Sequence, residues 1–135
     1  MIELVLSRIK IDENRNEQVI VLKEREGTRL LPVVIGIAEV NAIKLKLSGI
    51  EPPRPLTHDL LLQTIESLGG HLTKIEIDKL ENNTFYAKLV LSPNGNGEEI
   101  RVDARPSDSV ALALRAGAPI FAAEDVMEQA GLSES

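Results

Sequence analysis

A change of hydrophobic period near Gly36 constrains the fold of this chain most. Before it, apolar residues follow the two-residue period and β-branched runs of strands, over 2–11, 18–22 and 29–35. After it, apolar residues recur at the spacing of a helix. Pro32 has no N–H for a ladder, so its strand is expected at a sheet edge or a bulge. The first third of the chain therefore predicts hairpin strands followed by a helix.

The rest of the chain repeats this plan of strands and helices with different spacing. Thr57 is the predicted N-cap of a second helix that stops at Gly69 and Gly70. A third helix is predicted from Pro106 or Ser107 to just before Gly117. Further strands are predicted over 72–77, 85–91, 99–104 and 119–121, and a last helix over about 125–130. Strands in hairpins with three to four helices predict an α+β fold with a largely antiparallel sheet.

Length and composition indicate one folded domain over residues 1–135. A chain of 135 residues split in two would leave each half near the size at which a core becomes marginal. Hydrophobic residues make up 43% of it, which excludes extensive disorder. No apolar run approaches the roughly 20 residues that span a bilayer. We therefore expect a cytoplasmic protein with an acidic C-terminal tail from about residue 124.

The net charge and the residue types present limit the kinds of metal site, nucleophile and nucleic-acid interaction that the chain can support. The chain has no cysteine, which excludes disulfides, thiolate metal sites and thiol nucleophiles, so any metal must be bound by oxygen or imidazole. Four acids follow Arg115, where there is no Lys or Arg, and they account for −4 of the net charge of −6. A nearly neutral body with few aromatic residues is a poor match to non-specific nucleic-acid binding.

Two polar segments lie where chemistry is expected, at the junctions into helices. They are residues 54–59, Arg-Pro-Leu-Thr-His-Asp, and residues 103–108, Asp-Ala-Arg-Pro-Ser-Asp. Free N–H groups at a helix start favour anions, so both segments are candidate anion sites. Strand alternation places Arg101, Asp103 and Arg105 on the face opposite Val102.

A purely structural interpretation of these segments stays open. Thr57 and Ser107 fit ordinary helix caps, and first-turn acids such as Asp108 fit the helix dipole. His58 is equally compatible with a base, a metal ligand or a surface imidazole. Residue types also permit a Ser107–His58–Asp triad, a weak signal in any chain. Glu39 is interpreted as a structural acid of its helix, and His71 as incidental.

At these same segments the sequence resembles a known family. The stretches that carry the resemblance are Leu31–Gly36 with Glu39, Arg54–Leu61, Phe85–Ala87, Asp103–Arg115 and Ala118–Phe121. They are similar to the bifunctional nuclease domain, also catalogued as a domain of unknown function. The resemblance spans nearly the whole chain, and it implies hydrolysis of DNA and RNA by a compact α+β domain that forms homo-oligomers, with a dimer favoured.

The resemblance also implies roles for particular residues. Asp103 and Asp108, with Asp59 as a third acid, are the expected ligands of Mg²⁺ or Mn²⁺, because a hard cation prefers carboxylate oxygen. His58 is the expected general base. Arg54, Arg105 and Arg115 are the expected phosphate-binding cations. The expected site therefore comprises His58, Asp59, Asp103 and Asp108 with these three arginines.

The alternative is a non-enzymatic oligomeric module that binds a ligand or regulates a partner, without nuclease activity. In this alternative the two polar segments only stabilise the connections that lead into the two helices. Convergence of Arg54, His58, Asp103 and Asp108 on an open cleft would favour the enzyme, and their burial against partners within the chain would favour the module.

Overall fold

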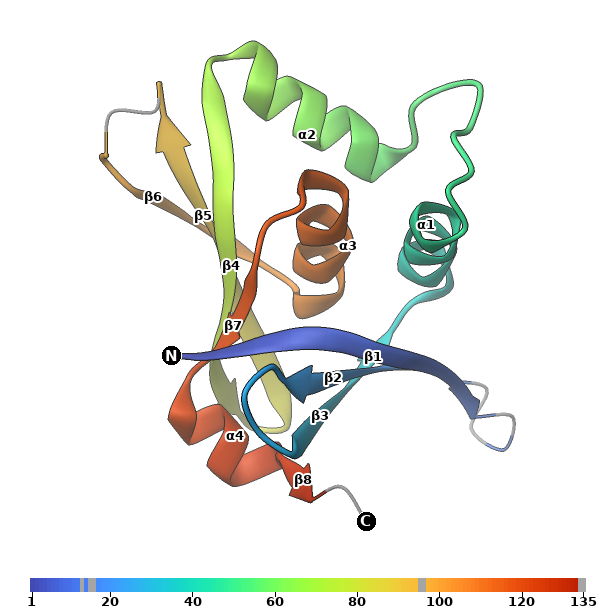
Figure 1. Ribbon diagram of the computed structural model, residues 1–135, viewed down its shortest axis with the longest axis vertical. Helices are drawn as coiled ribbons and strands as arrows, with labels where there is room; N and C mark the ends of the chain where they lie inside the picture. The colour runs from blue at the N-terminus through green and yellow to red at the C-terminus, as the bar shows by residue number, and fades with distance from the viewer. Residues whose placement is uncertain (13, 15–16, 95–96, 134–135) are drawn as a thin grey trace.

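The computed structural model describes residues 1–12, 14, 17–94 and 97–133 (Figure 1). In chain order its elements are β1 (Ile2–Asp12), β2 (Glu17–Glu24), β3 (Arg29–Ile35), α1 (Ile37–Leu47), α2 (Thr57–Ser67), β4 (Gly70–Glu81), β5 (Thr84–Pro93), β6 (Ile100–Ala104), α3 (Pro106–Ala116), β7 (Ile120–Ala122), α4 (Glu124–Ala130) and β8 (Leu132–Ser133). The predicted α+β fold with a mostly antiparallel sheet is confirmed. Over the described ranges, no helix combines the length and apolar character needed to cross a membrane.

One sheet collects all the strands, in the order β6-β5-β4-β7-β1-β2-β3-β8. The hairpins β1–β2–β3 and β4–β5–β6 form its two halves, and β7 joins them by pairing antiparallel with β1 and parallel with β4. Pro32 lies opposite Val21 of β2, while β8 pairs only with Arg29 and Leu30 at the start of β3. Contrary to the prediction, the strand of Pro32 is therefore neither the edge strand nor bulged, but β8 ends before Pro32, so the missing N–H of the proline leaves no ladder bond unmade.

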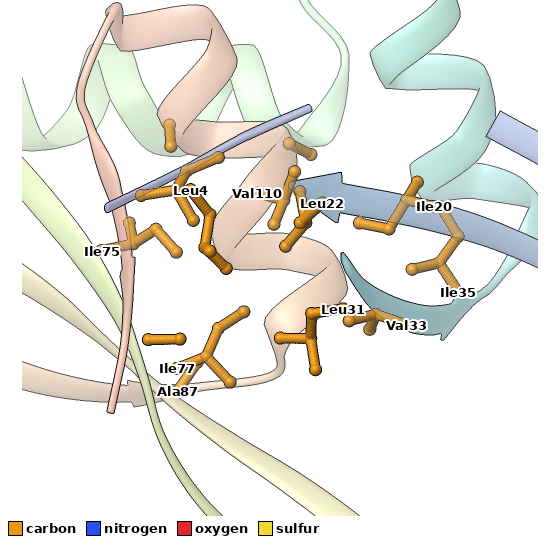
Figure 2. Packing of buried hydrophobic residues seen from close by; sticks show 14 of the residues in the cluster. Leu4, Ile20, Leu22, Leu31, Val33, Ile35, Ile75, Ile77, Ala87 and Val110 are labelled. Carbon is orange, nitrogen blue, oxygen red and sulfur yellow. The ribbon is translucent and has the colours of Figure 1, made fainter. Parts of the chain in front are cut away.

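Helix α3 lies inside the curve of the sheet, with α1 and α2 beside it (Figure 1). Its Val110, Ala111, Leu112 and Ala113 are fully buried, which matches a helix that is apolar on most faces. Figure 2 shows Val110 beside Leu4 and Leu22 of the first half of the sheet, and Ile77 of the second half belongs to the same buried cluster. Packing against α3 therefore fixes the halves relative to each other and sets where the start of α3 lies.

Turn chemistry explains where the second hairpin bends and where α3 ends. Asn82 and Asn83 have φ of 52° and 61°, the left-handed conformation that a tight β4–β5 turn requires. Gly117 follows α3 with a φ of 68°, so it is the predicted stop. The predicted Asn-Gly turn after β5 partly falls on residues 95 and 96, which lie outside the described residues.

Some local predictions need correction. Leu56 and Arg105 are the N-caps of α2 and α3, so neither Thr57 nor Ser107 caps its helix. The last helix, by contrast, was predicted correctly: the acidic end of the chain forms α4, with Val126 and Met127 buried in the core. Apolar residues at two helical positions are enough to dock this short helix against the sheet.

Candidate active site

The starts of the three large helices meet on one side of the molecule. Glu39 lies in the first turn of α1, His58 and Asp59 in that of α2, and Asp108 in that of α3. Arg105 is the last extended residue before α3. The helix-start residues of the two polar segments therefore lie close together in space, although His58 and Asp108 are fifty residues apart in the chain.

Four residues form one connected set, which we call the junction cluster: Glu39, His58, Arg105 and Asp108. His58 Nε2 lies 2.9 Å from Asp108 Oδ1. Arg105 donates from Nε to Asp108 Oδ2 at 3.0 Å and from Nη2 to Glu39 Oε1 at 2.6 Å. One guanidinium thus ties α1 to α3, and one imidazole ties α2 to α3.

Exposure differs sharply across the junction cluster. Glu39 and His58 are buried, whereas the Asp108 side chain is 34% exposed and the Arg105 side chain 68% exposed. The cluster is therefore anchored below the surface and open at Arg105. Arg105 also lines, with Phe85 and Ser107, a groove of about 570 Å³ between β3 and the β4–β5 turn.

The proton positions of His58 are set by its partner. Because Asp108 lies at Nε2 and a carboxylate only accepts, the neutral imidazole carries its proton on Nε2 and its free lone pair on Nδ1. No described residue forms a hydrogen bond with Nδ1. His58 Nδ1 is not among the side-chain atoms of the described ranges that are both fully buried and unpaired, which are Gln18 Oε1 and Asp78 Oδ1. Part of the Nδ1 surface is therefore accessible to water.

Electrostatics keep Asp108 ionised. Burial raises the pKa of its carboxyl, but the hydrogen bonds from His58 and Arg105 outweigh burial and lower that pKa below its usual value. Glu39 and Asp108 together carry two negative charges against the one positive charge of Arg105. The junction cluster therefore has an excess negative charge while His58 is neutral.

A second ion pair lies beside the junction cluster. Arg115, at the end of α3, donates from Nε to Asp59 and from Nη1 to the Ala42 carbonyl of α1 at 2.9 Å. Asp59 also accepts from the Leu56 N–H at 3.0 Å. The Arg115 hydrogen bond lowers the pKa of Asp59 most, burial opposes it, and the Leu56 N–H adds to the lowering. The Arg115 side chain is only 7% exposed, so its position is that of a buried clamp between helices.

Two further predicted site residues, Asp103 and Arg54, belong neither to the junction cluster nor to the Asp59–Arg115 pair. Asp103 is 79% exposed on the outer face of the sheet, where its nearest cation is Lys88 Nζ at 3.8 Å. The strand pleat places it on the face opposite Ala104, while the chain leaves the strand at Arg105 and turns toward the helices. Arg54 is exposed and forms no ion pair with any described residue. The weak triad hypothesis would need a hydrogen bond between Ser107 and His58. Over the described ranges, the structure shows none.

The donor set does not make a preformed metal centre. Within the ranges that the structure describes, no three His, Asp or Glu residues lie close enough together to hold a metal ion. Asp103 and Asp108 lie on different faces, and both carboxylates of the junction cluster already accept from Arg105. These residues do not fit the metal site that the resemblance implied.

Glu39 is the member of the junction cluster whose role the sequence analysis missed. Its position in a first helical turn has a sufficient local explanation in the helix dipole. Its partner Arg105 lies 66 residues away. The only signal in the sequence was that Glu39 falls in one of the stretches that carry the family resemblance.

Comparisons with known proteins agree with the resemblance. The profile of the bifunctional nuclease domain family matches residues 20–135. An uncharacterized protein of Mycobacterium tuberculosis is 48% identical over 124 residues, which cover 92% of this chain and 73% of that protein.

Plant proteins named as nucleases are more distant relatives. Bifunctional nuclease 1 of Oryza sativa subsp. japonica is 30% identical over 115 residues, 83% of this chain and 34% of the plant protein. Bifunctional nuclease 1 of Arabidopsis thaliana is 30% identical over 104 residues, 75% of this chain and 32% of the plant protein. The chain thus spans about a third of each plant nuclease.

Proposed function

Because this chain belongs to the bifunctional nuclease domain family, we propose that it hydrolyses phosphodiester bonds of DNA and RNA at the junction cluster. The observation that supports this most is the His58–Asp108 pair at 2.9 Å, which leaves Nδ1 of a buried imidazole without a partner among the described residues. A histidine oriented by an ionised carboxylate is a recurrent general base.

The chemistry follows from the roles of three side chains. His58 Nδ1 accepts a proton from water as the water oxygen attacks phosphorus, the bond from phosphorus to the ester oxygen breaks, and that oxygen takes up a proton from solvent. Asp108 stabilises the imidazolium that forms, as its lowered pKa allows. Arg105, exposed and with Nη1 free of described partners, stabilises charge on the phosphoryl oxygens. Positive charge on His58 also offsets the excess negative charge of the cluster.

Arg115 and Asp59 take a positioning role in this proposal. Their ion pair sets the orientation of the α2 start, and with it the residue next to Asp59, His58. Arg54 is the remaining candidate for a phosphate contact, because it is exposed and free of ion pairs with described residues. Dependence on Mg²⁺ or Mn²⁺ stays a prediction of the resemblance, and no step above requires the cation.

The rival proposal is the non-enzymatic module, and one observation favours it. Each acid of the site has a cationic or imidazole partner within the chain, and Arg115 is buried. Networks of this kind also serve only to fasten helices. A homo-oligomer, with a dimer favoured, and a cytoplasmic location belong to both proposals.

The deciding experiment compares two aspartate variants of one sequence segment. Purified protein is assayed on single-stranded DNA and RNA with Mg²⁺, Mn²⁺ or EDTA, beside Asp108→Asn and the matched Asp103→Asn. The junction-cluster proposal expects Asp108→Asn to lose at least about 100-fold in rate and Asp103→Asn to keep its activity.

The other outcomes separate the hypotheses. Loss of cleavage in Asp103→Asn as well, together with dependence on the cation, would support the metal site that the resemblance implied. Cleavage that survives both substitutions contradicts the assignment of these residues. Absence of cleavage by the wild-type chain under all three conditions favours the module.

A further inference from the structure

Strand β6 ends the sheet with an open edge. Its five residues, Ile100–Ala104, pair only with β5 among the described residues. The opposite end of the sheet is formed by the two residues of β8 and by the part of β3 beyond Leu30, where Pro32 interrupts the edge. An open edge presents unpaired N–H and C=O groups, and native proteins commonly protect it with Pro, Lys or a bulge. No Pro or Lys occurs in β6, and its pairing with β5 is regular.

The apolar core continues out to this edge without cover. Ile100 faces Leu91 and Val102 faces Leu89 across the β5–β6 ladder, so all four side chains lie on the helix side of the sheet. Leu89 is 6% exposed, whereas Ile100 is 48% exposed and Val102 39% exposed. The uncovered part of the apolar face therefore runs along β6 itself.

The outer face of β6 carries a charge pattern that is complementary to itself. Arg101 and Asp103 are neighbours on that face, on either side of Val102. If a second β6 lies antiparallel with the two Val102 residues face to face, each Arg101 lies opposite the Asp103 of the other copy. The apolar face then matches too, because each Ile100 lies opposite an Ala104.

We propose that a second copy of this chain docks along β6, antiparallel and with the two-fold axis at Val102, so that the two sheets become one. The proposal deepens the proposed homo-oligomer and is independent of nuclease activity. It makes β6 an interface rather than an edge, which accounts for its exposed Ile100 and Val102.

Charge selects this register over its neighbours. Continuous sheet faces allow shifts of two residues only, because a shift of one would mix the inner and outer faces. A shift one way places Arg101 opposite Arg101, and a shift the other way places Asp103 opposite Asp103. Directly opposed like charges are unfavourable, so the axis at Val102 is preferred.

Existing ion pairs are compatible with the docked state. Asp103 already lies 3.8 Å from Lys88 Nζ on β5, and docking would add the partner's Arg101 on its other side. Arg101 keeps its hydrogen bond to the buried Glu76. Burial raises the pKa of Glu76, but Arg101 and Lys74 outweigh burial and lower that pKa. The outer face then carries cations and acids in alternation across the interface.

Cysteine cross-linking tests the axis directly, because the chain contains no cysteine of its own. In the proposed dimer the two Val102 Cα atoms lie about 4.5–5.5 Å apart, within the range of a disulfide. The two Ile100 Cα atoms lie about 14 Å apart, four residues along the strand. Val102→Cys is therefore expected to form a disulfide-linked dimer under mild oxidation, and the matched Ile100→Cys is not.

A charge reversal tests the register. In the Val102→Cys background, Asp103→Arg puts a guanidinium opposite the partner's Arg101 and is expected to slow cross-linking about tenfold. Glu128→Arg, an equal reversal on the exposed part of α4, is expected to leave the rate unchanged. Circular dichroism checks that each variant is folded.

Sedimentation equilibrium of the wild-type chain, together with the cross-linking rates, distinguishes failure of the proposed oligomer from failure of the β6 interface or of its register. A single species of 14.8 kDa at millimolar concentration overturns both the oligomer and this interface. A dimer in which Val102→Cys cross-links no faster than Ile100→Cys overturns the interface alone. An unchanged rate in Asp103→Arg overturns the register.

Discussion

Replacement of Arg115 by methionine is expected to lower the free energy of unfolding by about 3 kcal/mol. The Arg115 side chain is 7% exposed and bridges Asp59 of α2 to the Ala42 carbonyl of α1. Methionine keeps much of the length and apolar contact of the stem but leaves a carboxylate and a carbonyl without their donor. Removal of one partner of a buried pair costs roughly 3–5 kcal/mol. The lower end applies because Asp59 is 23% exposed and keeps the Leu56 N–H.

Urea denaturation followed by circular dichroism measures this change, and thermal unfolding checks it. For 135 residues the unfolding entropy is about 0.28 kcal/mol/K, so a loss of about 3 kcal/mol lowers the Tm by about 10 °C. Arg25→Met is the matched control, because Arg25 is 58% exposed and its pair with Glu3 is a surface one. It is expected to cost less than about 1 kcal/mol. Equal small losses in both variants would refute the assignment of Arg115 as a buried clamp.

Three further predictions concern stability. Leu112→Ala removes a fully buried side chain of α3 and is expected to cost about 3 kcal/mol in urea denaturation, with a cost below about 1 kcal/mol contradicting the position of α3 in the core. Gly117→Ala places a Cβ where φ is 68° and no heavy atom lies within 4 Å, so a loss of about 1 kcal/mol is expected from backbone conformation alone. Asp59 and Asp108 have folded-state pKa values below the ordinary 3.8, so the unfolded chain binds more protons in acid. Their contribution to stability is present above the unfolded pKa and is lost as the pH falls through the folded values; a urea midpoint that does not fall in acid would contradict the two ion pairs.

Local pattern predicted most of the elements. The strand and helix periods and the glycine after α3 were readable because each depends on neighbours in sequence. The arrangement of the sheet was not, since the β7 strand of three residues pairs parallel with β4 and antiparallel with β1. The sequence of Ile120–Ala122 does not indicate which strands it pairs with. A strand of two residues such as β8 is too short to show an alternation of apolar and polar residues.

The site was predicted in part for the same reason. His58, Arg105 and Asp108 stand in two compact motifs, and the structure joins them in one hydrogen-bonded set. Strand alternation suggested that Arg101, Asp103 and Arg105 share a face, but Arg105 is where the chain leaves β6 and enters α3. The long-range partner of Glu39 and the burial of Arg115 depend on how α1 docks against α3, which only the tertiary structure determines.

Rescue of a histidine variant by imidazole tests the central claim, that His58 is a general base held by Asp108. The measurement is single-turnover cleavage of DNA and RNA by His58→Ala, with and without added imidazole, in a variant whose circular dichroism matches that of the wild type. The account predicts a loss of at least about 100-fold and its partial recovery by imidazole as the missing base. Undiminished cleavage by the folded variant, or a loss that imidazole does not relieve, would contradict it.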